Sequence, residues 1–153
     1  MIERGALSPC AKPVAPLLQP GGWLYSQCGQ LQPGREPVYL NPADAAVRGI
    51  GDGDVVELFN DRGRCLAGAI LSEAIMRGVA RLATGAWFDP APAAATGLDL
   101  ERHGNPNVLT LDRGASGLSQ GCVAQTCLVE AKRYEGTPPP VEIFAIPQIV
   151  PRA

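Results

Sequence analysis

The sequence lacks the features that place a protein in a membrane or send it across one. It contains no apolar run of about 18 residues, so we expect no transmembrane helix. Residues 1–22 contain neither the continuous apolar stretch of a signal peptide nor a twin-arginine pair. We therefore expect a cytoplasmic protein with no membrane partner.

Residues that usually build metal and nucleophile sites are also scarce. His103 is the only histidine, and the five cysteines include no Cys-x-x-Cys pair. Cys122 and Cys127 have the wrong spacing for a zinc knuckle, so we expect the cysteines to be reduced thiols, buried or half-buried. No Gly-x-Ser-x-Gly elbow and no phosphate-binding loop with its lysine are present. We expect neither metal ligands nor catalytic residues in this chain.

Basic charge and aromatic residues are limited too. The net charge is -2, and the longest basic cluster is Lys132-Arg133, which argues against a nucleic-acid partner. Aromatic residues make up 5% of the chain, so the core must depend on Val, Leu, Ile and Ala. With 153 residues, 46% of them hydrophobic, the chain suits a single domain with one core.

Glycine (18) and proline (15) are abundant instead, without a repeat, which indicates many turns. Prolines interrupt residues 1–22, which we expect to be irregular. Pro138 to Pro140 lie in a tail, 137–153, that should wrap as an extended arm or fray. The expected domain is therefore 23–136.

Within this domain the pattern is mainly β, with short helices. Strands are expected at 38–40, 55–59, 64–71, 78–83 and 125–134. A helix over 42–48 should be capped by Asn41 or Asp44 and end at Gly49, and 72–76 should form either a turn or a short helix. Many short strands joined by glycine turns favour a small β-barrel.

Two of the turns carry clear signals. Asp52 and Asp54 alternate with glycines, where aspartate favours a turn over acid-base chemistry. Asn60 to Gly63 is typical of a hairpin, with Gly63 able to take a positive φ.

The candidate ligand site is a polar loop with little strand character. Between residues 103 and 121, Asn, Gln, Ser and Thr alternate with glycines, and the carboxylate pair of Asp99 and Glu101 precedes them. Amide side chains both donate and accept hydrogen bonds, which suits a heterocycle such as a pterin or guanine edge. Glycines let backbone amides approach a phosphate. The alternative is a well-hydrogen-bonded loop that closes one end of a barrel.

Residues 40–83 resemble the molybdopterin-dinucleotide-binding module of the DMSO reductase superfamily. The resemblance rests on the Asn-Pro-x-Asp-Ala start, the Gly-Ile-x-Asp-Gly-Asp-x-Val turn, the Asn-Asp-Arg-Gly hairpin and the later Gly-Val strand. Residues 85–90, 103–121 and 126–136 are similar to the subgroup of biotin sulfoxide, DMSO and trimethylamine N-oxide reductases. The match runs in order over about 36–136.

This resemblance implies a double-psi β-barrel. It implies that the chain binds the pterin guanine dinucleotide part of a bis(molybdopterin guanine dinucleotide) molybdenum cofactor, shared with domains that are missing here. The parent enzymes reduce S- or N-oxides at molybdenum, and the chain would be the C-terminal domain or a truncated remnant of such a reductase.

The resemblance also implies site residues. Asn107 matches an asparagine that contacts a pterin, Gln120 a glutamine at the end of the loop, and Trp87 an aromatic residue near the cofactor. Ser26 and Gln27 resemble a Leu-His-Ser-Gln stretch, with Tyr25 in place of the histidine. Together with two neighbours in the loop, the expected cofactor-binding residues are Asn107, Gln120, Trp87, Ser26, Gln27, His103 and Asn105.

The parent enzymes contain several further domains, including the segment that ligates molybdenum, and residues 1–35 cannot replace them. We therefore expect the partner to be the remaining domains or another chain of a molybdenum reductase, and no catalysis by this chain alone. The alternatives are a non-catalytic fragment and a stand-alone interaction module without a cofactor of its own.

Overall fold

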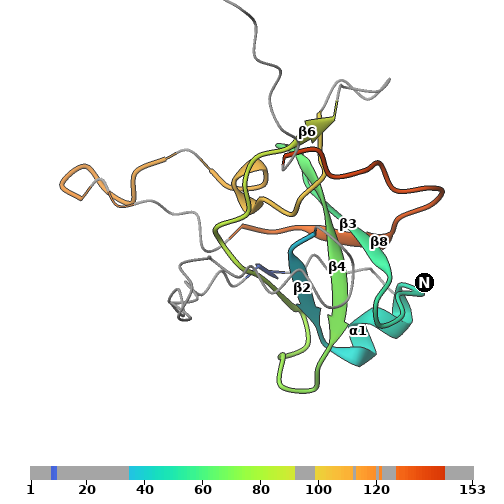
Figure 1. The fold of residues 1–153 in the computed structure, drawn as a ribbon. Helices are drawn as coiled ribbons and strands as arrows, with labels where there is room; N and C mark the ends of the chain where they lie inside the picture. Colours follow the sequence, from blue (N-terminus) through green and yellow to red (C-terminus); the bar gives the residue numbers. More distant parts are fainter. Residues whose placement is uncertain are drawn as a thin grey trace, which may run out of the picture.

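The computed structural model describes residues 8–9, 35–91, 99–111, 113–119, 121 and 127–143. In this part the protein is mainly β, as expected, with one α-helix and one 3-10 turn (Figure 1). The elements are β1 Ser8–Pro9, β2 Pro37–Leu40, α1 Pro42–Val47, β3 Val55–Phe59, β4 Arg64–Leu71, β5 Val79–Leu82, β6 Pro90–Ala91, β7 Leu100–Glu101, η2 Pro106–Val108 and β8 Glu130–Arg133.

Strand β4 is the centre of the sheet, and the described strands follow the order β1-β5-β2-β4-β3-β8. β3 pairs antiparallel with residues 64–68 of β4. On the other edge of β4, β2 pairs in parallel with 68–71 and β7 pairs in parallel with 64–65. The beginning of β2 and the end of β7 therefore meet beside the middle of β4, with α1 at one end of β4 and β6 at the other (Figure 1).

The core is aliphatic, as the low aromatic content requires. Its largest fully buried apolar side chains are Leu40, Leu58, Leu66, Leu82 and Leu109. Burial of each such side chain contributes about 1.5–3 kcal/mol. Because Leu109 follows η2 directly, it anchors the polar loop to the sheet.

Helix α1 begins as the sequence predicts. The Asn41 side chain accepts a hydrogen bond from the Ala43 amide at 3.0 Å, and Pro42 occupies the first turn. Asp44 is not the cap, because its carboxylate accepts from the Gly78 amide at 2.7 Å. Gly49 ends the helix with φ at 65°.

The aspartate turn and the hairpin over Asn60 to Gly63 are both confirmed, although Gly63 serves a different purpose from the one considered. Asp54 accepts from the Gly51 amide and Asp52 from the Leu71 amide, each at 2.8 Å. Gly63 does not have a positive φ. It is needed for close approach instead, since a Cβ there would lie 2.3 Å from the Val108 carbonyl oxygen.

The ends of other elements also differ from the prediction. The last strand starts at Glu130, because the carbonyl of Leu128 accepts from the Asn60 side chain at 3.2 Å. The residues expected at 125 and 126 lie outside the described part. Residues 72–76 form a turn stabilised by the Ser72 hydroxyl, which accepts from the Ala74 amide, and not a helix.

Short strands also occur where none was expected. β1 lies in the segment predicted to be irregular, and it pairs at the edge of the sheet with β5, where proline is tolerated. β6 and β7 pair antiparallel around the polar region. Within the described ranges, no helix combines the length and apolarity needed to cross a membrane.

Cys65 and Cys127 are free thiols, buried and half-buried as predicted, whereas the other three cysteines lie outside the described residues. Burial raises the pKa of Cys65 well above its ordinary value, and the nearby Glu101 carboxylate adds to the effect. The folded state therefore keeps this thiol protonated.

Gly63→Ala should lower the free energy of unfolding by about 1–3 kcal/mol, because the methyl group would push against the Val108 backbone. Urea unfolding followed by circular dichroism measures this. Gly117→Ala is the control, since a Cβ there meets nothing within 4 Å. Equal midpoints for the two variants would contradict the close contact.

The raised pKa of Cys65 should make the fold less stable at alkaline pH. The thiol contributes stability that is fully present below its ordinary value of 9.0 and is lost as pH rises toward the folded-state pKa. In this range the free energy of unfolding should fall by up to about 1.4 kcal/mol per pH unit. Chemical denaturation across this pH range measures the effect, and the free energy of unfolding of Cys65→Ala should lack this decrease. An identical pH dependence in the two proteins would disprove the contribution of Cys65.

Candidate functional site

The polar loop is organised by a buried carboxylate at its start. Glu101, at the end of β7, is 0% exposed. One of its oxygens accepts from the amides of Asp89 at 3.2 Å and His103 at 2.9 Å. The other accepts from Gly104 at 2.6 Å and Asn105 at 2.7 Å. These charge-assisted bonds fold residues 101–105 around one side chain.

Beside this carboxylate lies a buried ion pair. Arg102 donates to the Asp89 carboxylate at 2.6 Å, and the Arg102 amide donates to the Asp89 carbonyl at 2.9 Å. Burial works against the charge on Arg102, but the hydrogen bonds that Arg102 donates to the carboxylates of Glu142 and Asp89 outweigh it, so the pKa of Arg102 is raised. The pair fixes segment 86–91 against the loop.

Two expected site residues, His103 and Asn105, are buried and connect these segments. His103 is 2% exposed, and its Nδ1 lies 3.1 Å from the Trp87 carbonyl oxygen. Asn105 donates from its side chain to the Ala86 carbonyl at 2.9 Å and accepts from the Asn107 amide at 2.9 Å. The Asn105 side chain therefore joins the segment that carries Trp87 to the turn that carries Asn107.

The loop is also held from the sheet side. Gly104, at φ 98°, packs so closely on Glu36 that a Cβ would lie 2.7 Å from that side chain, and the Glu36 amide donates to the His103 carbonyl at 2.8 Å. At the far end, Asn60 donates to the Leu109 carbonyl at 2.9 Å and Arg62 to that of Thr110 at 2.9 Å. The loop is thus fixed at both ends.

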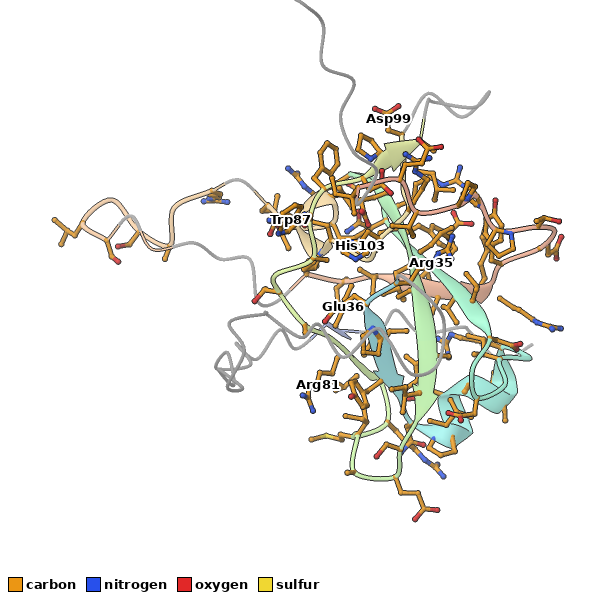
Figure 2. All side chains as sticks on the ribbon, in the orientation of Figure 1. Arg35, Glu36, Arg81, Trp87, Asp99 and His103 are labelled. Atoms are coloured by element: carbon orange, nitrogen blue, oxygen red, sulfur yellow. The ribbon has the colours of Figure 1, made fainter. Side chains whose placement is uncertain are left out.

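The exposed groups of this region include an aromatic ring and an amide. Trp87 is 62% exposed and Phe88 53%. Asn107 is exposed, and its side-chain amide makes no hydrogen bond to another described residue. Figure 2 shows Trp87 toward the outside of the molecule and His103 further in, both above Glu36. An exposed indole can stack on a flat heterocycle, and an exposed amide side chain can hydrogen-bond the edge of one.

The other expected site residues, Gln120, Ser26 and Gln27, lie outside the described part of the chain. Residues 113–119 project away from the sheet (Figure 1, orange), so the polar region is a packed loop, 101–110, followed by a separate one. No group of three or more His, Cys, Asp and Glu side chains that could hold a metal is present among the described residues.

The way in which Asp89, Glu101 and Arg102 organise the site was not predicted from the sequence. Glu101 stood out only as one of two nearby carboxylates. The usable signal is an acidic residue directly before a segment rich in Gly and Asn, because the free amides of such a segment can converge on a carboxylate. The partner Asp89 is 12 residues away from Glu101 in the sequence, so no local pattern joins them.

Glu101→Gln should lower the free energy of unfolding by about 2–4 kcal/mol, since the neutral amide turns an NH₂ donor toward amides that need acceptors. Chemical denaturation gives the value. Glu73→Gln, at an exposed turn, should stay within about 0.5 kcal/mol of the parent. If the Glu101 variant were as stable as the Glu73 variant, the carboxylate would not organise the loop.

Known proteins share the sequence of these segments. A family model described as the Molydopterin dinucleotide binding domain matches residues 25–128. Trimethylamine-N-oxide reductase 1 of Escherichia coli is 53% identical over 104 residues, which are 68% of this chain and 12% of the reductase. Biotin sulfoxide reductase of Cereibacter sphaeroides is 49% identical over 125 residues, 77% of this chain and 16% of the relative. The chain therefore spans only a small part of these relatives.

A solved structure shows the same fold. Acetylene hydratase from Pelobacter acetylenicus superimposes with a TM-score of 0.56 at 17% identity, covering 86% of this chain and 18% of that one. The family match takes in β2 to β7 and the whole loop of Glu101 to Thr110. The chain thus belongs to the molydopterin dinucleotide binding domain family, and it is homologous to a segment of the trimethylamine-N-oxide and biotin sulfoxide reductases.

Proposed function

We propose that this domain binds the pterin portion of a bis(molybdopterin guanine dinucleotide) cofactor through the surface around Trp87 and Asn107. The bound cofactor would supply oxygen-atom transfer at molybdenum in an S- or N-oxide reductase. The corresponding fold would be a double-psi β-barrel. The described strands, which form one sheet, would be part of this barrel.

One observation carries the proposal. The buried Asn105 side chain holds the backbones of Ala86 and Asn107, so it sets the spacing between an exposed indole and an exposed amide. A pterin is flat, with donors and acceptors along one edge. The described donor set fits it, because a ring face and a bidentate amide are the two groups such a ligand needs.

The site residues then divide into two roles. We assign direct contact with the cofactor to Trp87 and Asn107, and by the motif match to Gln120, Ser26 and Gln27. His103 and Asn105 are buried and act by holding Trp87 and Asn107 in place. Oriented hydrogen-bonding groups of this kind limit the reorganisation that binding requires.

The rest of the site would come from the remaining domains or from a partner chain of the reductase. The chain spans 12% and 16% of the lengths of two such relatives, so most of each reductase has no counterpart here. Large apolar side chains such as Trp87, Phe88 and Leu128 are more than half exposed, as at surfaces that another protein covers.

Asn107→Ala should weaken cofactor binding about tenfold, because one good hydrogen-bonding group is worth about 1.4 kcal/mol at such a site. The measurement is an anaerobic fluorescence titration of the purified chain with molybdopterin guanine dinucleotide cofactor released from a donor enzyme. Glu73→Ala, at the opposite end of β4, is the control and should bind like the parent.

Saturable binding that is weakened by Asn107→Ala but not by Glu73→Ala supports the assignment. Equal affinity in both variants would show that Asn107 is not a contact. Failure of the parent chain to bind would refute the proposal that this surface holds the cofactor without its partner domains.

A further inference from the structure

The described part of the tail, residues 137–143, packs back onto the domain through polar contacts near the site. Arg102 donates to the Glu142 carboxylate at 3.1 Å, and the Glu142 amide donates to the Asp89 carboxylate at 2.8 Å. Arg35, just before β2, donates to the Pro139 carbonyl. These residues of the tail follow the stretch that matches the family, 25–128.

Glu142 and Asp89 enclose Arg102 from two sides. Arg102 and Asp89 have side chains only 9% and 5% exposed, whereas that of Glu142 is 61% exposed. The buried Arg102–Asp89 pair needs both partners, because an isolated buried charge is strongly unfavourable. Glu142 adds a second acceptor to Arg102 and a backbone donor to Asp89. Arg102, Asp89 and Glu142 therefore each contact the other two, and these three residues form a closed ring of contacts.

This ring is linked directly to the residues that position the exposed groups. The Asp89 amide donates to Glu101, the same carboxylate that gathers Gly104 and Asn105. Asp89 follows Trp87 by two residues, and Arg102 immediately precedes His103. A shift of the ring would therefore move both Trp87 and the turn that carries Asn107.

We propose that Glu142 is a positioning residue, which acts through Arg102 and Asp89 to hold the cofactor-facing loop in place. Its effect on cofactor affinity rests on the proposed function above. Its effect on the loop itself does not, because the contacts exist without a ligand.

The test is hydrogen exchange measured by mass spectrometry on Glu142→Arg and Glu142→Gln in the full chain. The reporters are the amides that bond to Glu101 and Asp89 in segments 86–91 and 101–107. Placing a guanidinium beside Arg102 should speed their exchange about threefold to tenfold, and Glu142→Gln should speed it less. Amides of β3 and β4 should exchange as in the parent, which separates positioning from loss of the fold.

Glu135→Arg and Glu135→Gln are the matched controls. Glu135 lies just before the tail, is exposed, and has no hydrogen bond or ion pair with other residues in the described ranges. Both controls should exchange like the parent. Added salt should move the parent toward the Glu142→Gln pattern, because Glu142 is exposed enough to be screened.

Two results would overturn the proposal: unchanged exchange at 86–91 and 101–107 in Glu142→Arg, or equal acceleration in β3 and β4. If the parent binds the cofactor, Glu142→Arg should also weaken binding severalfold while Glu135→Arg does not, and equal affinities would overturn it as well. If the parent does not bind, the proposed function fails, and the exchange result alone decides the role of Glu142.

Discussion

The candidate site depends on a single buried carboxylate. Glu101 lies at the end of a strand of two residues, too short to order the chain after it by ladder hydrogen bonds alone. Four backbone amides point at its two oxygens, three of them from the residues that follow. These donors replace the water that the buried carboxylate loses on folding, and their bonds to one side chain order the loop.

Contacts distant in the sequence then fix where this ordered loop lies. Gly104 rests on Glu36 at the start of β2, and Gly63 in the β3–β4 hairpin lets the Val108 backbone come close. Asn60 reaches the carbonyl of Leu109, at the other end of the loop. Parallel pairing of β2 and β7 along one edge of β4 brings these segments together, so the sheet acts as the template for the site.

The geometry of the site is consistent with membership of the molydopterin dinucleotide binding domain family. Buried polar residues hold the loop, while an indole and an amide remain at the surface for a ligand. Such a division suits a domain that orients a cofactor whose chemistry is its own. The relatives are far longer than this chain, which covers 12% and 16% of the lengths of two of them.

The sequence by itself determined the elements whose signals are local: the Asn41 cap, strands β3 and β4, the aspartate turn, and the motifs that indicate the family. It also indicated the loop that contains Asn107. Only the tertiary structure decided that Gly63 serves close packing, that the last strand starts at Glu130, and that His103 and Asn105 are buried while Asn107 and Trp87 are exposed. The physical reason is that each of these depends on a partner far along the chain, such as Val108 for Gly63, Asn60 for Leu128 or Ala86 for Asn105, and a local pattern carries no information about such a partner.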